Sequence, residues 1–268
     1  TDTATTSGTI QVSVAADADA PTLTLDATTA TGTEDTAINL PDITSGLTDT
    51  DGSESLGLSI SGIPDGAVLT DGTNTFTGDG SSAADMSGWD LTALQVTPPA
   101  DSDANFDLTV TATSTEADGG DTASTFGTIN VNVDADADAP TLNVADVAGL
   151  EDSAIALNIT AEVTDDSESI SGITITGVPE GAVLSAGTSS VVDGVTTWTL
   201  SEADLPGLTV TPAENSDADF DLSVSVTSTD GASTTTTTDE MTVEVAGVAD
   251  APTLTVSVGE GEVTAGTG

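Results

Sequence analysis

Apolar and polar residues alternate along several short segments of this chain. Within residues 106–112 every second position is apolar, and the same alternation occurs within residues 220–226. A period of two is typical of a β-strand that buries one face, and no stretch shows the 3.6-residue period of an amphipathic helix. The pattern predicts seven strands in the first half of the chain, over residues 22–25, 38–40, 56–60, 68–69, 94–96, 106–113 and 126–133.

Turn-forming residues separate these predicted strands. Asp51-Gly52 and Pro64-Asp65-Gly66 are examples of sequences that favour tight turns. Seven alternating strands within about 115 residues predict a β-sandwich of the immunoglobulin or cadherin type. In such a fold Trp89 and Trp198, each followed two residues later by leucine, are expected to occupy similar places and to anchor the two cores.

The chain repeats one phrase three times. The sequence Asp-Ala-Asp-Ala-Pro-Thr-Leu starts at Asp17 and at Asp136, and its last six residues recur from Ala249. A segment of alternating apolar residues precedes each copy. Similarity at a fixed long period is typical of a tandem array.

The repeats predict how the chain is divided into domains. Residues 17–134 and 135–248 are predicted to form two complete β-sandwiches. Residues 1–16 are predicted to be the last strand of a preceding repeat, and residues 249–268 the first strand of a following one. The predicted fold is therefore all-β, with tandem immunoglobulin/cadherin-like β-sandwiches joined by short acidic linkers, in a chain that looks like an excerpt from a longer polypeptide.

The composition excludes several classes of function. The 268 residues include 46 Asp and Glu but no Lys, Arg, His or Cys, so the formal net charge is -46. Without His, Cys and Lys there is no Ser-His-Asp or Cys-His catalysis, no Schiff base and no zinc finger. Without Lys and Arg the chain has no means to neutralise phosphates, and it contains no apolar run long enough to cross a bilayer. We expect no nucleic-acid partner and no membrane insertion.

Carboxylates alone leave one type of enzyme open. A glycosidase needs only two carboxylates, but aromatic residues make up 2% of the chain, which is too few for a stripe on which a sugar polymer stacks. We therefore expect the protein not to be an enzyme.

The same composition creates an electrostatic problem for a compact fold. No side-chain salt bridge can form, and two carboxylates 4 Å apart repel by about 1 kcal/mol even in water. Clustered carboxylates therefore need external cations, and sites that offer only oxygen ligands favour Ca²⁺. The alternative is a solvated acidic surface, as in halophilic proteins, that needs only salt.

The acidic residues recur in four groups per repeat: just after the first strand, in the loop 49–54, in the loop 101–103, and in the linker 134–138. An Asp-x-Asp pair brings two carboxylates within reach of one ion, although such pairs are also common in turns. The predicted calcium ligands are Asp17, Asp19, Glu34, Asp35, Asp49, Asp51, Asp101, Asp103, Asp134, Asp136, Asp138, Glu151, Asp152, Asp165, Asp166, Asp217, Asp219 and Asp250.

The order of these groups resembles that of cadherin repeats. There an early Glu, an Asp-x-Glu loop, an Asp-rich linker and an Asp-x-Asp loop of the next repeat share calcium. The corresponding positions here are Glu34, Asp101 with Asp103, the linker 134–138, and Asp165 with Asp166. Ser114 stands where the cadherin pattern has Asp, so the chain departs from that pattern for one of the usual three ions.

A second resemblance covers almost the whole chain. Glu-Asp-Thr-Ala-Ile-x-Leu from Glu34, Ile-Pro-Asp-Gly-Ala-Val-Leu from Ile63 and Val-Thr-Pro-Pro-Ala-Asp-Ser-Asp-Ala-Asn-Phe from Val96 look like repeats of giant bacterial adhesins exported by type I secretion, the RTX or Lap-like adhesins. The resemblance implies calcium-stiffened extender modules at the bacterial cell surface that project an adhesive region for attachment or biofilm formation. Their partners are the neighbouring repeats of the same polypeptide.

Two other functions stay open. The segments 10–14 and 253–258 each lack the rest of their repeat, so strand exchange between chains would build an extracellular filament or sheath from copies of this protein. Sugar binding through calcium is chemically feasible, but no lectin-like pattern supports it.

Overall fold

The computed structural model describes residues 1–165, 167–252 and 254. Within this part of the chain the regular structure consists of β-strands and a single 3₁₀ turn, η1 (Glu202–Asp204). The all-β prediction is therefore confirmed. None of the described residues belongs to a helix long and apolar enough to cross a membrane.

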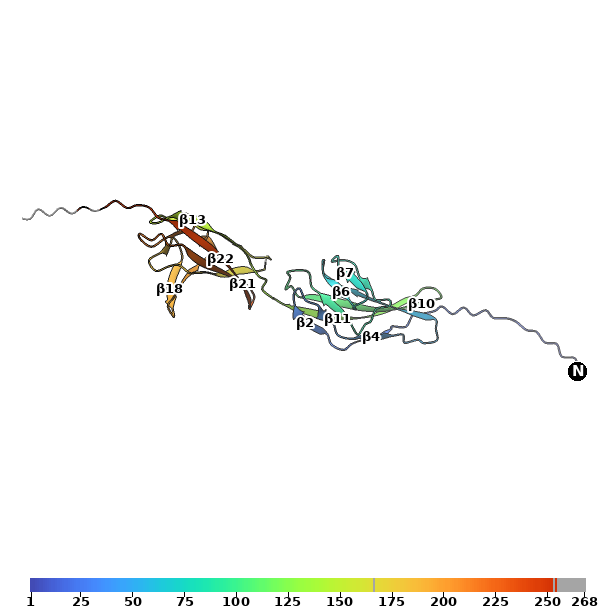
Figure 1. Ribbon diagram of the computed structural model, residues 1–268. Coiled ribbons are helices and arrows are strands. Elements are labelled where there is room, and N and C mark those ends of the chain that lie inside the picture. Colours follow the sequence, from blue (N-terminus) through green and yellow to red (C-terminus); the bar gives the residue numbers. More distant parts are fainter. Residues whose placement is uncertain (166, 253, 255–268) are drawn as a thin grey trace, which may run out of the picture. The chain divides into compact units, whose positions relative to one another are not determined.

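The first sandwich contains strands β1 to β11 (Figure 1). A five-stranded sheet in the order β2-β11-β10-β5-β8 and a four-stranded sheet in the order β3-β9-β6-β7 enclose its core, and β1 pairs with β4. The strands are β1 (Thr22–Leu25), β2 (Thr29–Thr33), β3 (Ile38–Asn39), β4 (Ile43–Gly46), β5 (Glu54–Ser61), β6 (Val68–Thr70), β7 (Thr75–Thr77), β8 (Ala84–Asp85), β9 (Gln95–Thr97), β10 (Phe106–Glu116) and β11 (Thr122–Asp134).

The second sandwich contains strands β12 to β22 and has a different sheet order. Its six-stranded sheet runs β13-β22-β21-β16-β19-β18, and its three-stranded sheet runs β14-β20-β17. The strands are β12 (Thr141–Ala145), β13 (Val147–Leu150), β14 (Ile155–Ala156), β15 (Asn158–Glu162), β16 (Ser169–Thr176), β17 (Val183–Leu184), β18 (Thr188–Val192), β19 (Val195–Leu200), β20 (Thr209–Thr211), β21 (Phe220–Asp230) and β22 (Ser233–Ala246).

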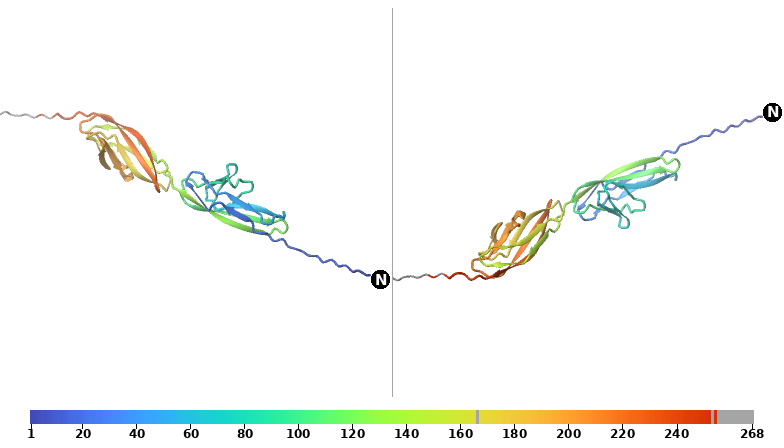
Figure 2. Two further views of the ribbon diagram at one scale, coloured as in Figure 1. Left: turned by 90° about the horizontal axis from the view of Figure 1, so that it is seen from below. Right: turned by 90° about the horizontal axis from the view of Figure 1, so that it is seen from above.

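The alternating pattern places the core as predicted. On β10 the side chains of Leu108, Val110 and Ala112 are fully buried, while the threonines between them are not. β10 and β11 pair antiparallel from Phe106 opposite Val131 to Thr115 opposite Thr122, and the three views show them side by side (Figures 1 and 2). Each sandwich has its own apolar cluster, so the two cores are separate.

The two tryptophans are half-buried against these clusters, which confirms that they pack on the cores. The prediction that they occupy similar places is wrong. Ile60 and Ile175 correspond in sequence, and Ile175 faces Trp198 across the sheet whereas Ile60 faces Ala84. Trp89 instead follows β8 in a loop, where its backbone N–H donates to the carbonyl oxygen of Met86. The strand opposite Ile175 belongs to a hairpin that the first sandwich does not have.

The described residues form two compact units. The first consists of Thr1–Ala139 together with Val163–Ser169 and Ser228–Thr235, and the second begins at Pro140 and holds the remainder. Two loops that belong by sequence to the second repeat are thus part of the first unit. The domain bounds at residues 17–134 and 135–248 stay a prediction.

The segment 10–14 does not form the strand that its alternation predicts. Residues 1–21 contain no strand, and Ile10, Val12 and Val14 are 79–87% exposed. A strand needs a hydrogen-bonded neighbour, and no described residue pairs with this segment. The corresponding segment 253–258 lies outside the described residues, apart from Leu254.

Candidate metal centre

Glu34 follows β2 directly and is the most buried of the acidic side chains, with 1% of its surface exposed. Its N–H donates to the carbonyl oxygen of Asp134, and its Oε1 accepts the N–H of Asp136 at 2.8 Å. The linker therefore fixes Glu34 through two backbone groups. Its second oxygen, Oε2, is buried without a hydrogen-bond partner among the described residues.

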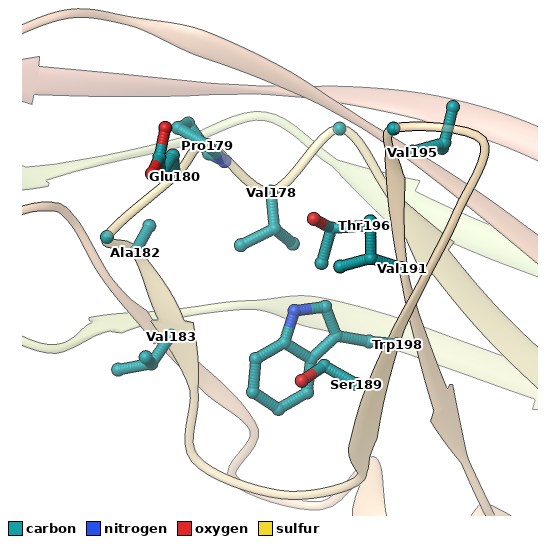
Figure 3. Close-up of a pocket in the computed structure, with 13 residues that line it drawn as sticks. Val178, Pro179, Glu180, Ala182, Val183, Ser189, Val191, Val195, Thr196 and Trp198 are labelled. Carbon is teal, nitrogen blue, oxygen red and sulfur yellow. The ribbon is translucent and has the colours of Figure 1, made fainter.

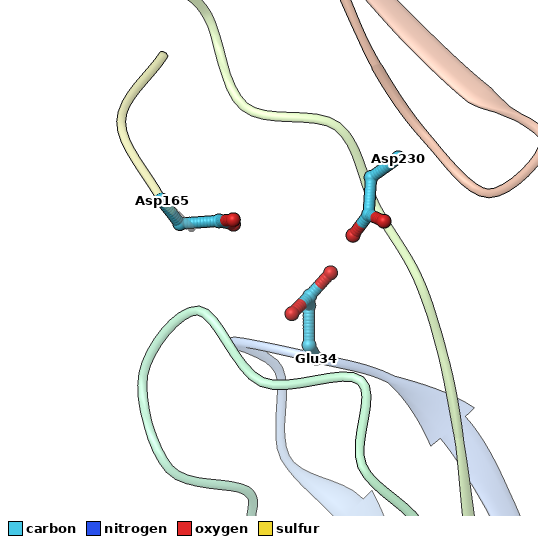
Figure 4. A group of neighbouring side chains, drawn as sticks. All are labelled: Glu34, Asp165 and Asp230. Atoms are coloured by element: carbon cyan, nitrogen blue, oxygen red, sulfur yellow. The ribbon is translucent and has the colours of Figure 1, made fainter. Parts of the chain in front are cut away.

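Glu34 is one of three buried carboxylates that lie close together. One oxygen each of Glu34, Asp165 and Asp230 lies within 4.8 Å of the other two. All three residues belong to the first compact unit, and Figure 4 shows the carboxylates pointing toward a common space. Like charges at this separation repel, and burial reduces the screening by water, so the group is unfavourable unless a proton or a cation is present.

The Asp165 side chain also has one occupied and one free oxygen. Its Oδ1 accepts hydrogen bonds from the hydroxyl and the N–H of Ser167, both at 2.6 Å, and from the N–H of Glu168 at 3.0 Å. Its Oδ2 is buried and has no partner in the described structure. Two unpaired, buried carboxylate oxygens thus lie in one site, which is costly without a ligand.

Two further groups of carboxylates share residues with this one. Asp35, Asp101 and Asp138 form one group, and Asp138, Asp165 and Glu168 form the other, each within the same 4.8 Å limit. Asp35 and Asp101 both adopt left-handed backbone conformations, with φ near 55°, and the Asp101 N–H donates to Oδ1 of Asp35 at 3.1 Å. Because Asp138 and Asp165 connect the groups, the site is one continuous cluster, formed by Glu34, Asp35, Asp101, Asp138, Asp165, Glu168 and Asp230.

The environment moves the pKa values of these groups in opposite directions. The pKa of Glu34 is raised to about 7, mainly by burial and in part by the neighbouring Asp230 and Asp165, while the hydrogen bond from Asp136 acts in the opposite direction. Burial also raises the pKa of Asp138, with the charges of Asp35 and Glu168 acting in the same direction. Burial tends to raise the pKa of Asp165 too, but the hydrogen bonds from Ser167 and Glu168 outweigh it and hold the pKa below its ordinary value. With a pKa of about 7, Glu34 holds a proton over part of the neutral pH range when no cation is present.

Serine hydroxyls donate hydrogen bonds to backbone carbonyl oxygens of the linker phrase. Ser228 is fully buried and donates its hydroxyl hydrogen to the carbonyl oxygen of Asp138 at 2.5 Å, while the Asp138 N–H donates to Oε1 of Glu168. Ser114 makes the same bond to the carbonyl oxygen of Asp19. The position that carries Asp in the cadherin pattern thus carries a neutral clamp for the backbone here.

A related set of carboxylates surrounds the earlier copy of the linker phrase. The Asp19 N–H donates to Oε1 of Glu54 at 2.7 Å, as Asp138 does to Glu168. Oε2 of Glu54 and Oε2 of Glu116 are both buried without a partner among the described residues. Burial raises the pKa of Glu116, and the charges of Glu54, Asp49 and Asp51 raise it further. This set lacks a counterpart of Glu34.

The far end of the second repeat holds the counterparts of Glu34 and Asp35. Oε1 of Glu151 accepts the N–H of Val248 at 2.6 Å, and Oδ1 of Asp152 accepts the N–H of Asn215 at 2.9 Å. Oδ1 of Asp219 accepts the N–H of Val245, which ties it to strand β22. This hydrogen bond accounts for Asp219 without a metal.

The structure brings together only some of the predicted ligands. Glu34, Asp35, Asp101, Asp138 and Asp165 belong to the cluster. The groups of the described structure that fit one ion do not contain the predicted ligands Asp17, Asp19, Asp49, Asp51, Asp103, Asp134, Asp136, Glu151, Asp152, Asp217, Asp219 and Asp250. Asp166 lies outside the described residues.

Two members of the cluster, Glu168 and Asp230, are missing from the predicted ligands. Asp230 ends β21 just before Gly231, where Thr-Asp-Gly reads as an ordinary turn. One feature of the sequence does point to Asp230. It stands two residues after Ser228, just as the acidic Glu116 stands two residues after Ser114 in the first repeat. Glu168 corresponds to Glu54, since each accepts the N–H of the matching aspartate of the linker phrase.

Comparisons with known proteins give no family. No protein-family model matches the chain, and no curated protein matches it. Among solved structures, cadherin repeats EC1-3 of Drosophila N-cadherin align over 87% of this chain and 69% of theirs, at 16% identity and a TM-score of 0.25. Repeats EC1-2 of human protocadherin-24 align over 87% and 99%, at 11% identity and a TM-score of 0.34. Domains 4 and 5 of the S-layer protein SbsC align over 86% and 99%, at 13% identity and a TM-score of 0.27. The fold assignment rests on the strand order described above.

Proposed function

We propose that this chain consists of non-catalytic, calcium-stiffened extender repeats of a large bacterial cell-surface adhesin. The observation that carries the proposal is the pair of buried, unpartnered oxygens on Glu34 and Asp165, beside Asp230, in a chain without a side-chain cation. A hard divalent ion with oxygen ligands satisfies these oxygens and removes the repulsion.

The seven carboxylates of the cluster supply enough oxygens for the six to eight ligands that Ca²⁺ takes. A bound cation would tie the linker residue Asp138 to Glu34 and to the loop that carries Asp165 and Glu168. Ligand at about 100 times its Kd would add roughly 2.7 kcal/mol of stability per site, because it binds only the folded form. Extracellular modules bind calcium at roughly 10⁻⁴–10⁻³ M, so such a site fills outside the cell and not inside it.

The role as a surface spacer rests on the sequence phrases shared with type I-secreted adhesins and on a composition without His, Cys, Lys or Arg. In this role the repeats hold an adhesive region away from the cell for attachment or biofilm formation. Calcium makes the linker rigid, and its removal restores repulsion among the acidic residues.

Titration calorimetry with Ca²⁺ and Mg²⁺ on the full chain tests the proposal. We expect saturable Ca²⁺ binding that Glu34→Gln weakens at least tenfold, while Asp42→Asn, an exposed carboxylate away from the cluster, leaves it unchanged. X-ray scattering then compares the full chain in calcium and in EDTA. An unchanged maximum dimension in EDTA, or equal effects of the two substitutions, contradicts the proposal.

A second candidate function is a filament built by strand exchange between copies. The alternating side chains of Ile10, Val12 and Val14 are exposed and unpaired among the described residues, which is the form that a donor strand takes. Light scattering across a concentration series distinguishes this function. Growth of the particles with concentration that Val12→Asp abolishes supports this function. A monomer mass that stays constant across the series excludes it.

A further inference from the structure

The two sandwiches differ at one sheet edge, although the sequence there is the same. Ala67-Val68-Leu69 and Ala182-Val183-Leu184 follow matching Pro-acid-Gly turns. In the first sandwich β6 lies between β9 and β7, whereas in the second its counterpart β17 pairs with β20 alone. Among the described residues, this edge of the second sandwich is therefore open where the first sandwich has a fourth strand.

The first sandwich shows what fills this edge. The chain continues from β7 into Gly78, whose carbonyl oxygen accepts the Gly66 N–H at 3.1 Å and whose N–H donates to the Ala67 carbonyl oxygen at 2.8 Å. A Cβ atom at Gly78 would lie 2.1 Å from the carbonyl oxygen of Pro64. An extended segment thus fits here only if it carries glycine at this point.

The second sandwich contains the same turn, which in the first sandwich binds the extended segment through Gly78. Gly181 has φ +87° where Gly66 has +84°, and the Ala182 N–H donates to the Pro179 carbonyl oxygen at 3.1 Å, as in the first sandwich. Within the described structure no residue makes the two bonds that Gly78 makes. The chain instead forms the hairpin β18–β19, which pairs with β16 in the opposite sheet.

A cavity of about 760 Å³ lies between the open edge and this hairpin. Figure 3 shows Ala182 and Val183 on one side of it and Ser189, Val191 and Trp198 on the other. Val183 is 52% exposed, and Nε1 of Trp198 is buried without an acceptor among the described residues. The walls thus combine apolar side chains, an aromatic ring, the hydroxyls of Ser189 and Thr196, the Glu180 carboxylate and the backbone groups of a strand edge, which suit a peptide better than an anionic small molecule.

We propose that this edge binds an extended, glycine-containing peptide segment of a partner protein, which adds as a strand beside β17 with its glycine opposite Ala182. Backbone hydrogen bonds to Gly181 and Ala182 would supply affinity, and the glycine would supply specificity. Because the chain carries a net charge of -46, a neutral or basic segment is favoured. No residue of the carboxylate cluster lines the cavity, so the inference does not depend on calcium.

Fluorescence of Trp198 tests the inference in the full chain carrying Trp89→Phe, where Trp198 is the only tryptophan. The probe is a synthetic peptide with the sequence of residues 73–80 in which Asn replaces Asp79, so that it is neutral when blocked at both ends, and the control peptide also carries Gly78→Val. We expect a saturable change in emission with the glycine peptide, with one peptide per chain, and at least tenfold weaker binding of the valine peptide. Absence of saturation up to about 1 mM, or an equal response to both peptides, overturns the inference.

Discussion

The hydroxyl of Ser228 donates to the carbonyl oxygen of Asp138 at 2.5 Å, so a residue of the second repeat holds the backbone of the linker from within a buried site. The Asp138 N–H is used in turn by Glu168. The backbone of the linker is therefore held at both the N–H and the carbonyl oxygen of Asp138 by side chains of the protein itself. The serine hydroxyl and the Glu168 carboxylate thus hold the linker backbone together.

Substitution of this serine tests that role. Ser228→Ala leaves a buried carbonyl oxygen without its donor, so we expect a loss of about 1–2 kcal/mol in the free energy of unfolding. Ser114→Ala, which removes the same bond to Asp19, is the matched variant and should cost a similar amount. Chemical denaturation in EDTA measures both. A calcium affinity that falls without any loss of stability would show that Ser228 is a ligand and not a clamp.

The raised pKa of Glu34 predicts how stability depends on pH without calcium. A carboxyl whose pKa is 4.5 when unfolded and about 7 when folded binds its proton more tightly in the folded state. Its contribution is fully present below pH 4.5 and is lost as the pH rises through 7. The protein should therefore lose roughly 1–3 kcal/mol relative to Glu34→Gln between pH 5 and pH 8 in EDTA.

Saturating calcium should reverse this dependence, because the cation favours the ionised carboxylate. Thermal unfolding of the two proteins in EDTA and in calcium, at pH 5 and pH 8, measures the effect as a difference. Other carboxylates, such as Asp71, whose pKa the Asn74 backbone N–H holds below its ordinary value, contribute equally to both proteins and cancel. Parallel pH profiles in EDTA would contradict the assignment of the proton to Glu34.

The carboxylates around Asp19 predict a second and weaker class of sites. Glu54 and Glu116 each bury an unpartnered oxygen, but the described structure places no group of three carboxylates there within the 4.8 Å limit. We expect Glu116→Gln to weaken only the lower-affinity phase of a calcium titration, by about tenfold, or about 1.4 kcal/mol. Glu34→Gln should affect only the tighter phase. A single phase that both substitutions weaken equally would show that the sites are not independent.

Gly78 is predicted to be intolerant of any side chain. Gly78→Ala places a Cβ atom against the carbonyl oxygen of Pro64, so the edge strand β7 has to shift, at a cost of about 1–3 kcal/mol. Gly57→Ala is the control, since its nearest neighbour would be 3.9 Å away on Thr113 and alanine loses less backbone entropy in a strand. Equal unfolding midpoints for the two variants would contradict the close approach.

Period-two alternation was sufficient to predict the long strands. β10 from Leu108 onward and β11 from Ile129 onward bury every second side chain, as their sequence alternation predicts. β2 was not predicted because Thr-Ala-Thr-Gly-Thr has little apolar alternation, and it forms by pairing parallel to β11. The short β7 and β8 were missed for the same reason, since tertiary pairing and not local pattern defines them.

The carboxylate cluster was predictable only in part. Glu34 and Asp165 lie in phrases that recur along the chain, and recurrence pointed to them. Asp230 lies in a sequence typical of a turn, and only the return of β21 to the linker makes it a member. The open edge at β17 was invisible in the sequence, because the residues on the receiving side are nearly the same in both repeats.

The cluster draws Glu34 from one sequence repeat and Asp165 with Asp230 from the next. The cluster therefore spans the boundary between two of the sequence repeats that a gene duplication would copy. Inserting or deleting one whole repeat joins the end of one copy to the start of another and so recreates the joint, although a joint that starts from the second repeat has Asn215 in place of Asp101. Such an array can change its length by recombination while the acidic groups at each internal joint stay together.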